Sequence, residues 1–222
     1  MASTALSDVY ATDEDLWLVG SSDWPILVPQ SQMLATGTNG AISAGAWSLT
    51  SATVDFEEQG VAAGHIVRLS SPRETFKRDV FLAVESSSAG TLTLRRPGMA
   101  TGKGAPPSAS AVTSVAFDVF TFDPQIENAA YEMHQKFGVD AGVAYREPSN
   151  LYDRRCFRRL TALWVLYTEY LQSQRTGDGD FPLKVKAYKS AYDEQLASAQ
   201  VLWGSDGNQQ PPTNRFGMRI SR

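Results

Sequence analysis

The chain has 222 residues, of which 42% are hydrophobic, so it can form one large domain or two small ones and is not disordered as a whole. Its formal net charge of −4 gives no general reason to expect nucleic-acid binding, and its single cysteine excludes an internal disulfide. The first ten residues do not resemble a signal peptide, and no apolar run is long enough for a membrane helix. We therefore expect a protein that folds in a reducing compartment and does not enter a membrane.

The charges are unevenly distributed along the chain. No Lys or Arg precedes Arg68, and residues 1–67 contain eight acidic residues, whereas the remainder contains 20 basic and 16 acidic residues. The acidic part of one copy could therefore contact the basic part of another. The alternative is that both parts are ordinary solvated surface, because exposed ion pairs contribute little.

The first predicted element is a short helix from Thr12 to Val19. Thr12 is a suitable N-cap with Asp15 at position N3, and the acidic residues 13–15 lie where the helix dipole favours negative charge. The helix is expected to end at Gly20, because a Gly-Ser-Ser run and then Trp24-Pro25 follow.

Residues 31–120 are predicted to form a β-rich insert. Gly37, Gly40 and Gly45 indicate a loop at its beginning. Five segments rich in β-formers follow, separated by turn residues: 47–56, 65–69, 80–84, 91–94 and 112–122. A long Gly- and Pro-rich loop is expected at 98–107. Five short strands favour a small antiparallel barrel or sandwich.

Three further helices are predicted after the insert. Asp123-Pro124 is a typical helix start, and Gly138 ends that helix. Ser149 or Asn150 caps the longest helix, which runs to about Arg175. Its apolar residues recur every three or four positions and predict a buried stripe: Tyr152, Cys156, Leu160, Leu163, Tyr167 and Tyr170. The last helix, about 181–203, has the same spacing at Val185, Tyr188, Tyr192, Leu196, Ala199 and Trp203.

The predicted fold class is therefore α+β: a helical bundle interrupted by a small antiparallel β-barrel or sandwich insert, with an extended C-terminal tail. The bundle comprises residues 1–30 and 121–203, the insert residues 31–120, and the tail residues 204–222.

No residue pattern indicates catalysis, a metal site or a cofactor site. The Gly98–Gly104 segment lacks the Ser or Thr and the following helix of a phosphate loop, and Asp178–Asp180 suits a turn between helices better than a calcium loop. His65 and His134 lie on different predicted elements, and neither has a second His or Cys at the spacing of metal ligands. Cys156 has arginine neighbours but lies on the apolar stripe, which favours an inert thiol. We expect a structural protein rather than an enzyme.

Four arginines form the strongest charge signal, because like charges three or four residues apart destabilise an isolated helix and require acidic partners. They are Arg154, Arg155, Arg158 and Arg159. One possibility is a contact between subunits, with the acidic first helix at Asp13, Glu14 and Asp15 as its counterpart. The other is pairing within the chain, with Asp153, Glu147 or Glu169.

The C-terminal segment 214–222 alternates like a strand. Its apolar row consists of Phe216, Met218 and Ile220, and its other row contains Arg215, Gly217, Arg219 and Ser221, before the final Arg222. Pro211-Pro212 before it cannot be helical. The segment has no obvious strand partner in the chain, so it is either a frayed terminus or a strand that pairs with another protein.

These features together resemble the head-to-tail connector (adaptor) proteins of tailed bacteriophages. The resemblance rests on the start Tyr10–Leu16, on the paired helices with Leu151–Arg155 and Leu160–Leu163, and on the loose tail beyond Trp203. It covers about 1–30 and 121–203, and the insert departs from the minimal adaptor. Such adaptors are small helical bundles that form a ring, usually of twelve copies, beneath the portal, and their C-terminal segments dock onto portal subunits.

The resemblance implies a virion protein of the head–tail neck, assembled in the host cytoplasm. Its partners would be the portal protein, a tail or stopper protein, and further copies of itself. Genomic DNA would pass through the ring without sequence-specific binding, and no cofactor would be needed. One alternative is a tail-completion or stopper protein. Another is a β-barrel module that binds a glycan or receptor, which would need exposed aromatic residues; Trp47 is the single tryptophan of the insert and is expected in its core.

Overall fold

The computed structural model describes residues 10–139, 151, 155–173 and 181–199, and the predicted tail at 204–222 lies outside them. The protein is α+β, with a closed six-stranded antiparallel barrel and, among the described residues, five α-helices. It divides into two compact units. The barrel unit comprises residues 20–122, and the helical unit comprises residues 1–19 and 123–222. The limits predicted from the sequence lie at 30/31 and 120/121.

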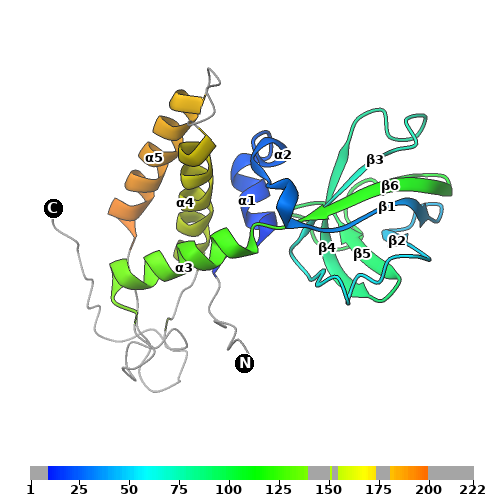
Figure 1. Cartoon of the computed structure of the whole chain (residues 1–222), viewed down its shortest axis with the longest axis horizontal. Coiled ribbons are helices and arrows are strands. Elements are labelled where there is room, and N and C mark those ends of the chain that lie inside the picture. The colour runs from blue at the N-terminus through cyan, green and yellow to red at the C-terminus, as the bar shows by residue number, and fades with distance from the viewer. Residues whose placement is uncertain (1–9, 140–150, 152–154, 174–180, 200–222) are drawn as a thin grey trace. The chain divides into compact units, whose positions relative to one another are not determined.

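The barrel strands follow the order β1-β2-β5-β4-β3-β6, and β6 pairs with β1 to close the barrel (Figure 1). Every neighbouring pair is antiparallel. The strands are β1 Met33–Ile42, β2 Ser48–Thr50, β3 Ile66–Ser71, β4 Val80–Ser88, β5 Thr91–Arg95 and β6 Val112–Phe120. The sequence left open whether the β-rich insert is a barrel or a sandwich, and the structure shows a closed barrel.

Strand β1 corrects the sequence prediction of a loop around Gly37 and Gly40. Both glycines lie inside this ten-residue strand. A Cβ atom at Gly37 would lie 2.6 Å from Cζ of Phe117, and one at Gly40 would lie 2.8 Å from Cδ1 of Leu49. These glycines are therefore needed because core side chains approach the strand backbone closely. The long strand predicted at 47–56 was also wrong, because pairing there is confined to β2.

The barrel core follows the period of two expected for strands. In β5 the alternation is regular, with Leu92 and Leu94 fully buried. A second short helix, α2 Trp24–Leu27, begins where Trp24-Pro25 was predicted only to end the first helix, because proline is tolerated in a helix's first turn. The buried Trp24 ring contacts Phe81, Phe120 and Phe122 edge-on. A 3-10 turn, η1 Gln30–Gln32, leads into β1.

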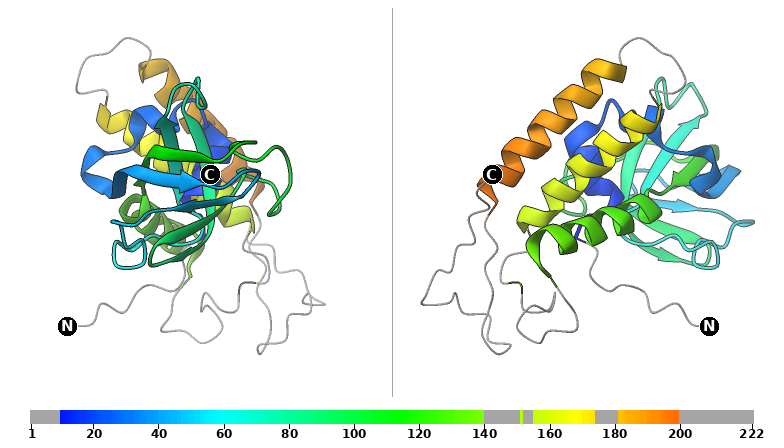
Figure 2. Two further views of the ribbon diagram at one scale, coloured as in Figure 1. Left: turned by 90° about the vertical axis from the view of Figure 1, so that its right-hand side faces the viewer. Right: turned by 60° about the vertical axis from the view of Figure 1, so that its left-hand side comes forward.

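The described part of the helical unit contains four helices: α1 Asp13–Gly20, α3 Asp123–Phe137, α4 Arg155–Ser173 and α5 Phe181–Ser198. Helices α4 and α5 run side by side in opposite directions, and α3 crosses the end at which α4 begins (Figures 1 and 2). Helix α5 ends at Ser198, before its predicted end at 203, and the described part of α4 lies within the predicted range 150–175. An antiparallel helix pair was expected from the spacing of their apolar residues.

Local sequence chemistry fixes the ends of these helices. The carboxylate of Asp15 accepts hydrogen bonds from the backbone N–H and the hydroxyl of Thr12, at 3.0 and 3.3 Å, which confirms the predicted cap of α1. Gly138 ends α3 with φ +65°, and the N–H of Val139 bonds to the carbonyl of His134. This is the Schellman arrangement, which satisfies carbonyls at a helix end.

The helical core contains residues from all parts of the unit. Its buried members are Tyr10, Ala130, Met133, Phe137, Val139, Leu151, Phe157, Leu160, Leu163 and Tyr192. Leu160, Leu163 and Tyr170 of the predicted α4 stripe are buried, whereas Tyr167 is half-buried and the side chains of Tyr152 and Cys156 are not among those described. In α5, only Tyr192 is fully buried.

Candidate assembly surfaces

The predicted acidic and arginine-rich surfaces approach each other within one chain, where Arg158 of α4 forms an ion pair with Asp15 of α1. Nε of Arg158 lies 3.8 Å from a carboxylate oxygen of Asp15. The Arg158 side chain is 60% exposed and that of Asp15 is 18% exposed. An ion pair this long and this exposed contributes between about 0 and 1 kcal/mol. The guanidinium of Arg158 therefore remains accessible to a stronger acidic partner.

The other residues of the predicted interface are placed differently. Arg159 is exposed on α4, whereas Asp13 and Glu14 are buried on α1. Arg155 begins α4, but its side chain is not among those described, and Arg154 lies outside the described residues. Among the side chains that the structure describes, the exposed charges of this predicted set are those of Arg158 and Arg159.

Glu169, one of the predicted partners within the chain, is buried on α4 with 8% exposure. Burial raises the pKa of its carboxyl group above the ordinary value, and a hydrogen bond with Gln125 of α3 partly opposes this effect. This carboxyl therefore joins two helices in the core of the unit. The remaining proposed partners, Glu147 and Asp153, lie outside the described residues.

A lysine joins three helices of the same unit. Nζ of Lys136 donates a hydrogen bond to Oη of Tyr192 at 2.8 Å. The same ammonium lies 4.6 Å from the Trp164 ring centroid and 4.8 Å from that of Tyr192. Desolvation, reinforced by the nearby Lys189, lowers the pKa of Lys136, and burial raises that of Tyr192. These contacts make α3, α4 and α5 one rigid support for the α4 surface.

Both histidines serve local structure. Nε2 of His134 lies 2.7 Å from Oη of Tyr10, which ties α3 to the segment before α1. Nδ1 of His65 accepts a hydrogen bond from the backbone N–H of Ala62 at 3.1 Å. His65 precedes β3 instead of lying within it, and His134 is half-buried rather than on the helix surface.

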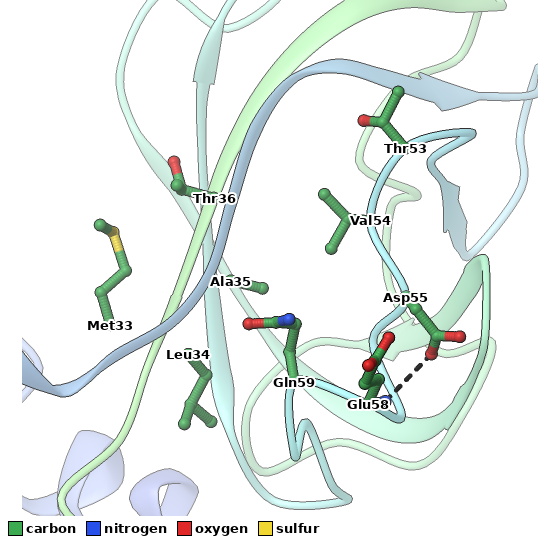
Figure 3. Close-up of a pocket in the computed structure, with 9 residues that line it drawn as sticks. All are labelled: Met33, Leu34, Ala35, Thr36, Thr53, Val54, Asp55, Glu58 and Gln59. Carbon is green, nitrogen blue, oxygen red and sulfur yellow. Dashed lines mark hydrogen bonds between the residues drawn. The ribbon is translucent and has the colours of Figure 1, made fainter.

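The barrel unit has an opening that sequence analysis missed. Strand β1 pairs with β6 from Met33 to Ile42, but with β2 only at Ala41 and Thr50. The β2-facing edge of residues 33–38 therefore has no strand partner among the described residues. Between this edge and the segment after β2 lies a pocket of about 420 Å³ (Figure 3), which we call the barrel seam.

The outer wall of the barrel seam is firmly attached to the barrel. Phe56 is fully buried against Phe117, and its N–H donates to the carbonyl of Ala89 at 2.8 Å. At one end, Nδ2 of Asn39 in β1 donates to Oγ1 of Thr53 at 2.8 Å. The seam is thus a preformed groove between two fixed walls.

The lining of the seam mixes polar and apolar side chains and includes two acidic residues, Asp55 and Glu58. Figure 3 shows Val54 and Gln59 extending between β1 and the opposite wall, with Asp55 and Glu58 close together on that wall. A carboxylate oxygen of Asp55 accepts a hydrogen bond from the backbone N–H of Glu58 at 3.0 Å. Among the described residues, no ion pair joins either carboxylate to a cation.

The predicted docking residues of the tail, Arg215–Arg222, lie outside the described residues. No described helix combines the length and the apolar character needed to cross a membrane. In comparisons with known proteins, no family model, curated protein or solved structure matches the chain.

Proposed function

We propose that the chain is a connector subunit of a tailed bacteriophage, which forms a ring between the capsid portal and the tail around the DNA exit channel. The helical unit is the adaptor core, a bundle into which the barrel is inserted between α1 and α3. The proposed function is structural, and no residue is proposed to be catalytic. The ring, of twelve copies as in the adaptors that the chain resembles, joins the portal to a tail or stopper protein through protein contacts alone.

The observation that carries the proposal is the packing of the segments that resemble adaptors. Tyr10, Leu151, Leu160 and Leu163 come from the separate stretches that carry the resemblance, and they belong to one buried cluster. The Tyr10 ring stacks on Phe157 of α4 with centroids 4.6 Å apart. These stretches therefore form one structural element, as a shared adaptor core requires.

The exposed guanidiniums support a role in assembly. Arg158 and Arg159 lie on a helix whose other face is buried, and the aromatic and lysine contacts of Lys136 hold that helix rigidly. A rigid helix with exposed arginines can form charge-assisted contacts with an acidic surface of a neighbouring copy.

The glycan-binding alternative gains no support from the barrel. The lining of the seam contains no aromatic side chain among its described residues, and Trp47 packs against the barrel core. A stopper protein, which lies lower in the neck, would also form a ring through protein contacts. It would differ from a connector in the proteins that it contacts.

Removal of Thr213–Arg222 tests the docking role of the tail. The proposal assigns these residues to docking rather than to the folded core, so the truncated protein is expected to keep its thermal stability and to lose attachment to DNA-filled heads. The control is the full-length chain, assayed in parallel by co-sedimentation with heads. Attachment of the truncated protein at the full-length level would contradict portal docking through the tail.

A further inference from the structure

We propose that neighbouring copies of this chain associate head to tail, with the arginines of α4 on one copy against the outward face of α3 on the next. We define the outward face of α3 by its exposed residues Glu127, Tyr131 and Glu132. The inference rests on the proposed function, because it names the contact between subunits of the ring. It differs from the contact with α1 that the sequence suggested.

The acidic residues of α1 are unsuited to this contact. Asp13 and Glu14 are buried. The Asp15 side chain is mostly buried, and its carboxylate already accepts the two hydrogen bonds from Thr12 that cap α1. A guanidinium from another copy therefore needs a different acidic surface.

The outward face of α3 offers an acidic surface in the same unit. The opposite side of this helix is buried in the core, through Ile126, Ala129, Ala130, Met133 and Phe137. Glu127 and Tyr131 lie one turn apart on the exposed side, and Glu132 follows directly. From Asp123 to Gln135 the helix contains three acidic residues and no Lys or Arg. The outward face is therefore negatively charged.

Tyr131 adds an aromatic ring between the two carboxylates of this face. It is 57% exposed, and it is the one aromatic residue among the large exposed apolar residues of the described chain. Tyrosine and arginine are enriched among the residues that dominate binding at protein interfaces. A guanidinium is also attracted to the face of a tyrosine ring. The outward face of α3 thus combines two features that bind arginine.

The arginines of α4 lack a strong acidic partner within the described part of their own chain. There, Arg159 forms no ion pair, and Arg158 forms only the long, exposed pair with Asp15. Glu127 likewise forms no ion pair with a described residue, whereas Glu132 lies one turn before Lys136 and attracts its ammonium group. Arg159 and Glu127 are therefore the two groups that gain most from a contact between copies.

A second copy of the chain is the partner because the helical unit carries both complementary surfaces. A contact between two different surfaces is heterologous, so each copy binds one neighbour on each side. Such a series of copies closes into a ring when the rotation between neighbours permits it. A contact of either surface with itself would instead bring like charges together and end at a dimer.

A pair of charge reversals tests this contact. Arg159→Glu and Glu127→Lys each bring like charges together between identical copies, so each variant alone should associate at least about tenfold more weakly in sedimentation at low salt. In an equimolar mixture, every contact between the two variants pairs opposite charges. Copies should then alternate, and association should return. The chain that carries both substitutions should also associate with itself.

Lys186→Glu and Glu194→Lys are the matched controls, because both residues are exposed on α5 and the substitutions change the net charge by the same amounts. Both controls should associate like the parent chain, and circular dichroism should show the same helix content in all variants. Association of either α3 or α4 variant at the parent level would overturn the proposal. Failure of the mixture and of the doubly substituted chain to associate would overturn it as well.

Portal rings separate this proposal from the connector function. Docking is assigned to the tail, so both variants should still attach to portal rings, but as separate copies rather than as a closed ring in electron microscopy. Closed rings of either variant on the portal would overturn the contact between α3 and α4 of neighbouring copies and leave the connector function standing. Parent chains that neither associate nor attach would contradict both.

Discussion

Replacement of Gly40 by alanine tests whether this glycine lies in a strand, as in the structure, or in a loop, as expected from the sequence. The added Cβ would lie 2.8 Å from Cδ1 of Leu49 and 3.0 Å from the carbonyl oxygen of Val115. The second contact is with the backbone of β6, which cannot rotate away. Overpacking of a core in this way costs about 1–3 kcal/mol. A loop glycine in open space would show no such cost.

Hydrogen exchange of β6 amides, followed by mass spectrometry, measures this cost in the barrel unit itself. At about 1.4 kcal/mol per factor of ten, exchange through barrel opening should accelerate by about 5- to 150-fold. Thr38→Ala is the matched control, because Thr38 is exposed on the same strand. Its effect should stay within about 0.5 kcal/mol. Equal exchange rates in the two variants would refute the close approach of Leu49 and β6 to Gly40.

Three further predictions concern the helical unit. Burial raises the pKa of Glu169 in the folded protein, so the neutral carboxyl favours folding at acid pH and this contribution is lost as the pH rises through the raised pKa. Glutamine keeps the side chain neutral at every pH. Glu169→Gln should therefore increase the thermal midpoint at pH 8 and change it least at pH 4. Equal shifts at both pH values would contradict this assignment. Replacing all four arginines at 154, 155, 158 and 159 with glutamine should weaken assembly, with a strong salt dependence in the parent protein, and sedimentation that is unchanged at every ionic strength would exclude the arginine surface from assembly. Replacing residues 20–122 with a Gly/Ser linker should preserve the helical circular dichroism of the remaining chain, and its loss would show that the two units depend on one core.

The parts of the fold that could be predicted depend on chemistry between near neighbours. The cap formed by Thr12 and Asp15, the start at Asp123-Pro124 and the stop at Gly138 each involve residues within five positions of one another. The alternation in β5 is likewise visible in five consecutive residues. Such signals are present in the sequence before any tertiary contact forms.

The parts that could not be predicted depend on distant residues. Gly37 and Gly40 resemble loop glycines until Phe117 and Leu49 are placed beside them. The seam exists because β1 pairs over its whole length with β6 and at one position with β2, and neither fact has a local signature. The acidic residues of its rim were visible in sequence, but only as part of the general charge of residues 1–67.

Electron microscopy of the purified protein, alone and mixed with portal rings encoded by the same genome, tests the connector proposal most directly. The account predicts a second ring stacked on the portal ring around a continuous central channel. A protein that remains monomeric in both samples, with portal rings left bare at saturating concentration, would contradict it.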